Sequence, residues 1–301
     1  MEKFVCILCK SNNYEIHNQT IRKDELKIYK ILKCLHCRHI QLYPNNYDTK
    51  HYYDNDNQDN ESKTIHNRAN DEYSEMLKTF HLQRLQILEQ NIIIEKSMKI
   101  IDIGGGKGEF VKLLNKRCDS VHILEPGISR INSINEENIV TINKLLDNNF
   151  ANENLNKFDI VTAFHVLEHV INPIQFLENS YKILKPNGIL YLEVPNQDDT
   201  RIQMSDYYKN NIWYCKAHIS YFTQHTLKYM LNKLEIDNYK IDGFERYNYE
   251  NYMFWLNNNK PQPMCSYYKG TSSSIEEELW INNRKQQLTS DSLSVILRKL
   301  I

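Results

Sequence analysis

The stretch IDIGGGKGEF, from Ile101 to Phe110, decides the fold of this sequence. It contains a G-x-G-x-G turn, with glycines at positions 104, 106 and 108, between an apolar strand and a helix. Glycine tolerates positive φ and lets a ligand approach the backbone without a Cβ in the way. Ligands of open α/β sheets bind at the carboxyl ends of the strands. The turn therefore predicts a ligand site after this strand.

The residues around the turn restrict the ligand. A dinucleotide fingerprint would need a third glycine at position 109, but Glu109 stands there, and its carboxylate would repel a pyrophosphate. No Gly-Lys-Ser/Thr follows at the spacing of a P-loop. Glu125 ends the next predicted strand about 20 residues later, where a carboxylate can accept both hydroxyls of a ribose. The alternative is a strand-end glutamate exposed to water. Together the turn and Glu125 favour an adenosine ligand without phosphates.

The rest of the sequence predicts an α/β fold, because strands alternate with helices. The expected strands are 98–104, 120–126, 158–164, 188–195, 239–247 and 291–300, and the expected helices are 109–117, 173–185 and 224–235. An amphipathic helix is expected over 71–92, although Arg84 interrupts its apolar face and Leu82 and Leu85 lie off that face.

Four of the seven cysteines form two C-x-x-C pairs, Cys6 with Cys9 and Cys34 with Cys37. Two such turns can direct four thiolates at one zinc ion, and a closed four-ligand site is structural. The alternatives are four unrelated cysteines, or replacement of one thiolate by His36 or His39. We expect a zinc-binding segment over 1–45 and, because 46–70 is polar and rich in Asn and Asp, a linker or mobile loop over 46–70.

From about Met98 onward, the sequence resembles the class I S-adenosylmethionine-dependent methyltransferases. IDIGGGKGEF is similar to the family's first motif, FDIVTAFHVLEHV (158–170) to its loop at the methionine end of the cofactor, and LKPNGILYLEVPN (184–196) to its fifth strand, with Asn187 in place of a frequent glycine. The resemblance implies a doubly wound, Rossmann-like, seven-stranded sheet over 71–301. It also implies S-adenosylmethionine as cofactor, bound by Asp102, Gly104, Gly105, Gly106, Gly108, Glu125, Pro126, Ala163 and His165.

A closer resemblance is to a subgroup with an N-terminal zinc-binding segment, many of whose members act on sugar nucleotides or surface-polysaccharide precursors. The subgroup's tail pattern has a counterpart in Arg246-Tyr247, Trp255-Leu256 and Lys260-Pro261. The resemblance implies a substrate-facing insertion around 197–222. Its aromatic side chains suit either stacking on a sugar or base or an ordinary half-buried lid; they are Tyr207, Tyr208, Trp213, Tyr214, Tyr221 and Phe222.

Candidate catalytic residues are His218 and His165, with Tyr221 orienting His218; for each histidine the alternative is a residue that only packs or orients the cofactor. His169 is expected to pack or cap. Sugar C-methyltransferases of this subgroup carry a Tyr-His-Glu-His run where this protein has residues 215–218, Cys-Lys-Ala-His. Abstraction of a carbon-bound proton needs a strong, well-placed base. Loss of that carboxylate therefore favours transfer to a hydroxyl or another heteroatom over carbon.

Charge separates the competing functions. Lys+Arg 37 against Asp+Glu 38 gives a net charge of −1, whereas a nucleic-acid reader usually carries a basic excess. An RNA methyltransferase is therefore the second hypothesis, and a catalytically inactive zinc-ribbon interaction protein is the third. The sequence has no apolar run of membrane-spanning length, and its N-terminus has no signal-peptide pattern. We expect a cytoplasmic enzyme with a small-molecule substrate.

Overall fold

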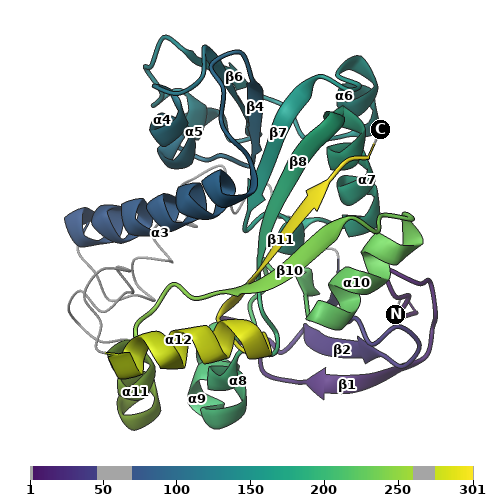
Figure 1. The fold of residues 1–301 in the computed structure, drawn as a ribbon. Helices are drawn as coiled ribbons and strands as arrows, with labels where there is room; N and C mark the ends of the chain where they lie inside the picture. The colour runs from purple at the N-terminus through teal and green to yellow at the C-terminus, as the bar shows by residue number, and fades with distance from the viewer. Residues whose placement is uncertain (1–2, 46–69, 260–274, 301) are drawn as a thin grey trace.

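The computed structural model describes residues 3–45, 70–259 and 275–300, and its centre is a seven-stranded sheet (Figure 1). The strand order is β10-β11-β8-β7-β4-β5-β6. Every neighbouring pair is parallel except the two pairs that β11 makes with β10 and β8. The strands are β4 (Lys99–Ile103), β5 (Ser120–Leu124), β6 (Ile139–Ile142), β7 (Phe158–Phe164), β8 (Leu184–Pro195), β10 (Tyr239–Phe244) and β11 (Ser292–Arg298). The predicted α/β class and doubly wound, mostly parallel sheet are confirmed.

Helices cover both faces of this sheet, because successive side chains of a strand point to opposite faces. Ile100 packs with apolar residues of helix α3 (Asn70–Asn91) and helix α4 (Glu109–Leu114). Its neighbour Ile101 packs in a second cluster with residues of α6 (Asn148–Glu153), α7 (Pro173–Ile183) and α10 (Gln224–Lys233). Strand β6, helix α6 and the short helix α5 (Ile128–Ile131) were not expected from the sequence.

Helix α3 differs from its predicted apolar face at two positions. Leu85, expected off the face, is only 5% exposed and belongs to the cluster between α3 and the sheet. Arg84, expected as an interruption, is also buried, because its guanidinium pairs with Glu193 of β8. Leu82 is exposed, as predicted. A charged residue on a buried helix face therefore marks an ion pair with the sheet.

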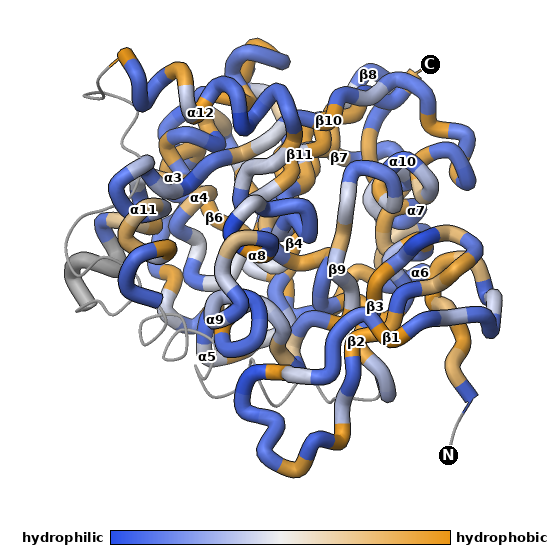
Figure 2. Tube along the Cα trace, turned by 90° about the horizontal axis from the view of Figure 1, so that it is seen from below, coloured by the Kyte–Doolittle hydropathy of each residue, from blue (hydrophilic) through white to orange (hydrophobic). Residues whose placement is uncertain are grey.

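The N-terminal segment forms a second, antiparallel sheet. Its strands are β1 (Tyr14–Asn18), β2 (Lys30–Cys34) and β3 (Ile40–Tyr43). The fourth strand, β9 (Ser220–Tyr221), comes from the connection that follows β8 and pairs with β3 (Figure 2). Lys233 of α10 also donates a hydrogen bond to the Leu8 carbonyl at 3.2 Å. The segment expected over 1–45 is thus joined to the large domain by main-chain pairing. Of the linker or mobile loop expected over 46–70, residues 46–69 lie outside the described residues, and Asn70 begins helix α3.

The connection after β8 packs as part of the protein interior. It contains α8 (Thr200–Met204), α9 (Asp206–Tyr208), a π-helical turn (Lys209–Trp213) and β9. Of the two alternatives for its six aromatic side chains, burial favours packing over a stacking surface, since five of them are buried and Tyr207 alone among them is exposed. Tyr208, Trp213, Tyr214 and Tyr221 share a cluster with Ile31 and Leu42 of the N-terminal sheet, and with Trp255 on the first of the last two described helices.

Those last helices are α11 (Tyr249–Asn258) and α12 (Ile275–Gln287), neither of which was expected. Figure 1 shows them at the same end of the molecule as α8, α9 and the N-terminal sheet. Lys260 and Pro261, part of the predicted tail pattern, lie outside the described residues. Within the described ranges, no helix has the length and apolar character needed to cross a membrane.

Candidate active site

The glycine turn after β4 has the backbone that its sequence predicts. Gly104, Gly106 and Gly108 have φ angles of 68°, 57° and 78°, in the left-handed region that favours glycine. A Cβ on Gly104 would lie 2.5 Å from Cγ2 of Val166, so this glycine also lets the loop after β7 approach. For a Cβ on Gly106, the nearest atom among the described residues, apart from its chain neighbours, would be Arg130 Nη1 at 3.7 Å, which leaves space for a ligand against this backbone.

Glu125 faces this turn from the end of β5. Its Oε2 accepts a hydrogen bond from the Gly106 N–H at 3.1 Å, and its Oε1 accepts one from the Gly127 N–H at 2.8 Å. The residue is 3% exposed, so the alternative of a solvent-exposed glutamate is wrong. A carboxylate oxygen has two lone-pair directions, and each oxygen uses one of them here. The remaining capacity fits the paired hydroxyls of a ribose.

Asp102 lies beneath the turn, at the end of β4. It is buried, and its Oδ1 accepts a hydrogen bond from the Thr162 hydroxyl at 2.6 Å. Burial raises the pKa of Asp102 to about 7, and the Thr162 hydrogen bond and the charge of Arg84 oppose that shift only in part. A Cβ on Gly105 would lie 2.8 Å from Oδ2 of Asp102, so this position needs a glycine.

Pro126 and Ala163 lie on two sides of the same site. Pro126 is half-buried and follows Glu125, and its carbonyl accepts a hydrogen bond from Asn143 at 2.8 Å. Ala163 is 2% exposed near the carboxyl end of β7, the strand beside β4. The expected cofactor residues therefore come from three adjacent strands.

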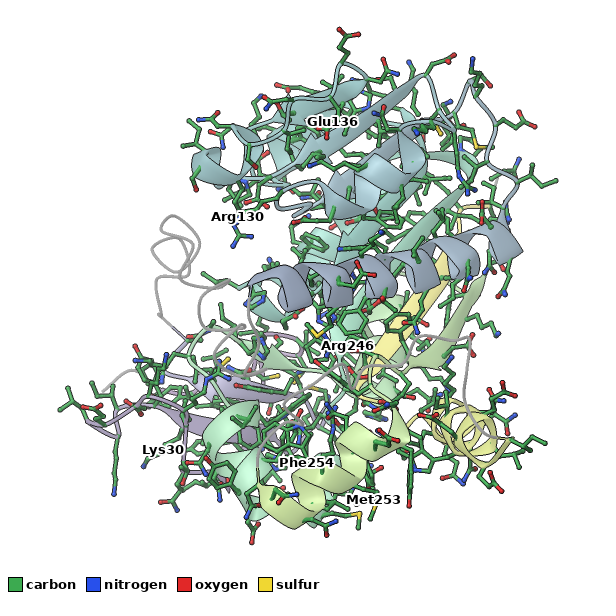
Figure 3. The ribbon with its side chains drawn as sticks, turned by 90° about the vertical axis from the view of Figure 1, so that its left-hand side faces the viewer. Lys30, Arg130, Glu136, Arg246, Met253 and Phe254 are labelled. Atoms are coloured by element: carbon green, nitrogen blue, oxygen red, sulfur yellow. The ribbon has the colours of Figure 1, made fainter. Side chains whose placement is uncertain are left out.

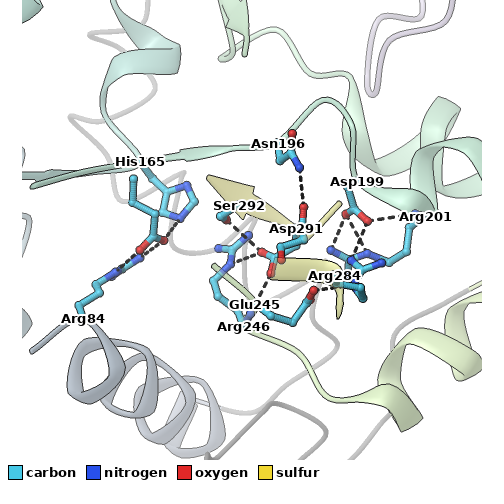
Figure 4. A network of polar contacts seen from close by, with 12 residues as sticks. Arg84, His165, Asn196, Asp199, Arg201, Glu245, Arg246, Arg284, Asp291 and Ser292 are labelled. Carbon is cyan, nitrogen blue, oxygen red and sulfur yellow. Dashed lines mark hydrogen bonds and ion pairs between the residues drawn. The ribbon is translucent and has the colours of Figure 1, made fainter. Parts of the chain in front are cut away.

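His165 follows β7 and connects two buried carboxylates. Its Nε2, on the side of Arg84 in Figure 4, lies 2.7 Å from Oε1 of Glu193. Its Nδ1 lies 3.3 Å from Oε1 of Glu168. Burial and the charge of Arg246 disfavour the imidazolium, but the hydrogen bonds to Glu168 and Glu193 outweigh them and raise the pKa of His165. Both ring nitrogens already have carboxylate partners. His165 is therefore better suited to position neighbouring groups than to act as a base.

Arg84 binds the same carboxylate of Glu193 that His165 contacts. Its guanidinium makes two hydrogen bonds to Glu193, of 2.8 and 2.6 Å. Burial would raise the pKa of Glu193, but Arg84 and His165 lower it well below its usual range. Neither Arg84 nor Glu193 was expected in the site from the sequence. The available signals were one acid inside the apolar strand GILYLEVP and one arginine on an apolar helix face.

Glu168, His169 and His218 form a second group beside His165. One potential ligand atom of each lies within 4.8 Å of the others. His169 Nδ1 lies 2.8 Å from the Ala217 carbonyl, and the rings of His169 and His218 are 4.9 Å apart. Burial lowers the pKa of His169 to about 4. His169 therefore bonds main chain, as the packing expectation suggested, but it also faces Glu168.

Tyr221 does not have the free hydroxyl that an orienting role would need. Its hydroxyl accepts a hydrogen bond from the Cys215 N–H and donates one to the Cys215 carbonyl, both at 3.0 Å. The residue is 2% exposed and belongs to β9. Its ring contacts that of His218 at 5.9 Å between centroids. The expectation for Tyr221 is therefore corrected to a structural contact that closes the loop 215–221.

A third polar network lies next to the site, below α3. Arg246, which lies beside α3 in Figure 3, pairs with Asp291, and its guanidinium lies 5.8 Å from the Phe80 ring of α3. Arg284 of α12 donates to Glu245 at 2.6 Å and lies 3.3 Å from Asp199. This network connects β10, β11, α8 and α12 (Figure 4). It gives Arg246, predicted from the tail pattern, a place in the packing of the last elements.

The four predicted metal-ligating cysteines come together in the N-terminal segment. Cys6 and Cys37 have their Sγ atoms 3.5 Å apart, as do Cys9 and Cys34, and all four sulfur atoms lie within 4.8 Å of one another. A disulfide would bring two sulfur atoms to about 2.05 Å. Thiolates about 2.3 Å from a zinc ion stand roughly 3.8 Å apart in a tetrahedron. The donor set fits zinc better than disulfides.

Comparison with known proteins gives a consistent result. The family described as "Methyltransferase domain" matches residues 72–240. Among curated relatives, a ubiquinone biosynthesis O-methyltransferase of Coxiella burnetii is 29% identical over 129 residues, which cover 40% of this chain and 55% of the relative. The corresponding enzyme of Vibrio parahaemolyticus is 24% identical over 127 residues, covering 39% and 54%. The protein thus spans about half the length of the curated relatives it matches.

The fold also has counterparts among solved structures. A SAM-dependent methyltransferase from Archaeoglobus fulgidus aligns with a TM-score of 0.51 at 18% identity, covering 75% of this chain and 94% of that one. At that identity the likeness concerns the fold alone. The matched family covers more than half of the sequence, from α3 to β10, and it contains both the glycine turn and the histidine cluster. The protein therefore belongs to the methyltransferase domain family.

Proposed function

We propose that this protein is an S-adenosylmethionine-dependent methyltransferase that acts on a hydroxyl of a small polar acceptor. The observation that carries the proposal is the position of two sites on neighbouring strands. An adenosine-type site formed by the glycine turn and Glu125 follows β4 and β5. The histidine and carboxylate cluster combines Glu168 and His169, which follow β7, with His218 from the connection after β8. Methyl transfer requires a cofactor and an acceptor in line, and adjacent strand ends provide that arrangement.

The residues of the turn fit this cofactor. Glu125 would accept the ribose hydroxyls, the backbone at Gly104 and Gly106 would pass close to the ligand, and Ala163 would line the methionine side. When bound, the cofactor supplies a methyl group from its sulfonium: the acceptor oxygen forms a bond to the methyl carbon while the sulfur–carbon bond breaks and leaves its electron pair on sulfur. The protein's own task is to align the acceptor and to remove the proton of its hydroxyl.

The cluster around His218 is the part of the protein that activates the acceptor in this proposal. His165 is less suited, because Glu168 and Glu193 already occupy both of its ring nitrogens. Tyr221 is excluded from direct proton transfer by its two hydrogen bonds to Cys215. His218 is half-buried and lies next to His169 and Glu168.

Transfer to oxygen is favoured over transfer to carbon by the run 215–218. Ala217 stands where the sugar C-methyltransferases have a carboxylate, and its carbonyl is occupied by His169. Cys215 is buried, and its main chain bonds to Tyr221. The matched relatives are also O-methyltransferases by name. A sugar product methylated at a ring carbon would contradict this part of the proposal.

For the acceptor, we propose a nucleotide-linked sugar or a surface-glycan precursor. The support is the resemblance to zinc-segment methyltransferases and the four-cysteine arrangement at the N-terminus, for which we propose a structural zinc ion. The net charge of −1 supports a small-molecule acceptor over RNA. Nothing in the described geometry favours the RNA or inactive-domain alternatives.

The test is transfer of label from methyl-labelled S-adenosylmethionine into a cell extract separated into small metabolites and RNA. Label in an acidic, sugar-containing small molecule is the expected result, and mass spectrometry would then identify the methylated atom. Label in RNA would overturn the acceptor assignment. A Glu125→Ala variant provides the matched blank, because it should bind the cofactor weakly and transfer little label.

A further inference from the structure

Outside the cysteine cluster, the described residues contain one more group with the composition of a metal site: Glu168, His169 and His218. Two imidazoles and one carboxylate are a donor set that binds Zn²⁺, Mn²⁺ or Fe²⁺ and leaves positions open. Donors about 2.1 Å from a six-coordinate ion stand roughly 3.0 Å apart when adjacent and 4.2 Å apart when opposite. The three ligand atoms lie within 4.8 Å of one another, which is close to these separations.

The hydrogen bonds of the cluster point to a cation between its members. His169 Nδ1 lies 2.8 Å from the Ala217 carbonyl and donates its proton to it, so Nε2 carries the lone pair of the neutral ring. That nitrogen is 3.7 Å from Oε1 of Glu168, so two acceptors face each other. Metal-bound histidines commonly donate their other N–H to a backbone carbonyl in this way.

Glu168 supplies a second, independent observation. The residue is 1% exposed, and within the described part of the protein its Oε2 has no hydrogen-bond partner. A buried carboxylate oxygen without a partner costs free energy, and a bound cation would compensate for it. Oε1 is near His165 and His169, so the carboxylate has one oxygen in the network already described and one left over.

The backbone holds the three ligands in place before any ion arrives. The Ile219 N–H donates to the Glu168 carbonyl at 2.8 Å, which fixes the residue after His218 to the loop after β7. The Leu42 N–H donates to the Ile219 carbonyl at 3.0 Å and so adds the N-terminal sheet to the same ladder. A metal site needs this kind of supported geometry.

We propose that Glu168, His169 and His218 bind one divalent transition-metal ion, and that an open position of this ion takes the acceptor hydroxyl. The role of the ion rests on the proposed methyl transfer, whereas its binding does not. A metal-bound hydroxyl loses its proton more readily than a free one, so His218 acts as a ligand instead of the base. The acceptor proton leaves to water or a neighbouring base as the oxygen–methyl bond forms.

Binding is tested with Mn²⁺ as the probe, on the full-length protein with zinc present. Aqueous Mn²⁺ has a six-line electron paramagnetic resonance spectrum that diminishes when the ion binds to the protein. Because Mn²⁺ prefers oxygen and nitrogen ligands to thiolates, it should not bind at the cysteine cluster. We expect one Mn²⁺ per wild-type molecule. Glu168→Gln and His218→Ala should each weaken binding by at least about tenfold, the lower end of what loss of a supporting interaction produces.

Two controls separate this result from unfolding and from surface binding. Glu178→Gln and His225→Ala change the same residue types on helices α7 and α10, at residues that are not members of the cluster, and should leave Mn²⁺ binding unchanged. Each variant is also assayed for S-adenosylmethionine binding by calorimetry, which reports an intact cofactor site. Cofactor binding without any saturable Mn²⁺ binding, or Mn²⁺ binding that Glu168→Gln and His218→Ala leave intact, would overturn the metal site while leaving the proposed methyl transfer standing.

Discussion

At the scale of single residues, the candidate site uses carboxylates in three different ways. Glu125 accepts two backbone N–H groups, Asp102 accepts one hydroxyl in a buried position, and Glu193 is held by Arg84 and His165. Burial raises the pKa of Asp102, whereas Arg84 and His165 lower the pKa of Glu193. Two of the three carboxylates yield predictions that one substitution can test.

The first concerns Glu125. Glu125→Ala should lower the affinity for S-adenosylmethionine by about tenfold to a hundredfold, because a hydrogen bond to a charged group contributes about 1.5–3 kcal/mol. Isothermal titration calorimetry measures the change. Glu137→Ala, at an exposed position nearby in the sequence, is the matched control. Unchanged affinity in Glu125→Ala would revive the inactive-domain alternative.

The second concerns Asp102 and pH. Its pKa is about 7 in the folded protein and about 3.9 when unfolded, so between these values the folded state binds more protons. The free energy of unfolding should therefore fall as pH rises from 4 to 7, by at most about 1.4 kcal/mol per pH unit from this residue. Asp102→Asn keeps the acceptor for Thr162 but cannot ionise, and should remove this slope.

Urea unfolding of the wild type and Asp102→Asn at pH 5, 6, 7 and 8 measures the difference. Asp119→Asn provides the control, because Asp119 has a well-exposed side chain. If the wild-type and Asp102→Asn curves ran parallel with pH, the carboxyl of Asp102 would not have the raised pKa. At pH 8, Asp102→Asn should be the more stable of the two.

At the scale of elements, helix α3 is anchored to the sheet by one buried ion pair. The side chains of Arg84 and Glu193 are 5% and 0% exposed. Removing one partner of a buried pair leaves an uncompensated charge and costs about 3–5 kcal/mol. Arg84→Met should lower the free energy of unfolding by that amount, measured by urea denaturation, and Arg84→Met/Glu193→Gln should recover part of it. Leu82→Ala, on the exposed face of α3, should change it by less than about 0.5 kcal/mol.

The sequence predicts some helices and strands well and others poorly, and the difference has a physical cause. Strands β4, β5, β7 and β8 and helices α7 and α10 have strong apolar periodicity, and the structure confirms them to within a few residues. Strand β6 lies at the edge of the sheet with two exposed residues, so its sequence carries little apolar signal. The ion pair of Arg84 with Glu193 joins residues far apart in the sequence, and a periodicity analysis reads each of them only as an interruption.

The candidate site shows the same division. The glycine turn and Glu125 were predictable because one strand–turn–helix unit and the next strand place them by spacing alone. The meeting of Glu168 with His218 was not, because it depends on how the loop after β7 lies against the connection after β8. Likewise, Tyr221 could be predicted near His218, but its hydrogen bonds to Cys215 follow from a tight turn that the sequence does not mark.

At the scale of the whole molecule, the cysteine segment and the candidate active site are parts of one hydrogen-bonded ladder. β3 pairs with β9, and Ile219 links that pair to the Glu168 carbonyl. The four cysteines and His218 are therefore structurally connected, although they lie far apart in the sequence. A substitution of these cysteines should therefore disturb the acceptor side of the site more than the cofactor side.

Loss of the proposed zinc ion tests this connection. Cys34→Ser, which removes one ligand of the proposed zinc ion, should raise hydrogen exchange at the Leu42 and Ile219 amides and reduce methyl transfer several-fold. Affinity for S-adenosylmethionine should change by less than about twofold, because none of the expected cofactor residues belongs to the ladder. Cys118→Ser, a buried cysteine elsewhere, serves as control. Equal losses of cofactor binding and transfer would show general unfolding instead.

The pairing of β3 with β9 also sets an order for biosynthesis. Ile40 pairs with Tyr221, so at ribosomal speeds of about 5–20 residues per second the last strand of the N-terminal sheet emerges roughly 10–40 s after the first three. All four cysteines are made before that interval begins. During it, the edge of β3 has no partner and is open to pairing with other nascent polypeptides. The cysteines are thus placed to hold three strands together on the ribosome until the strand that completes them has been translated.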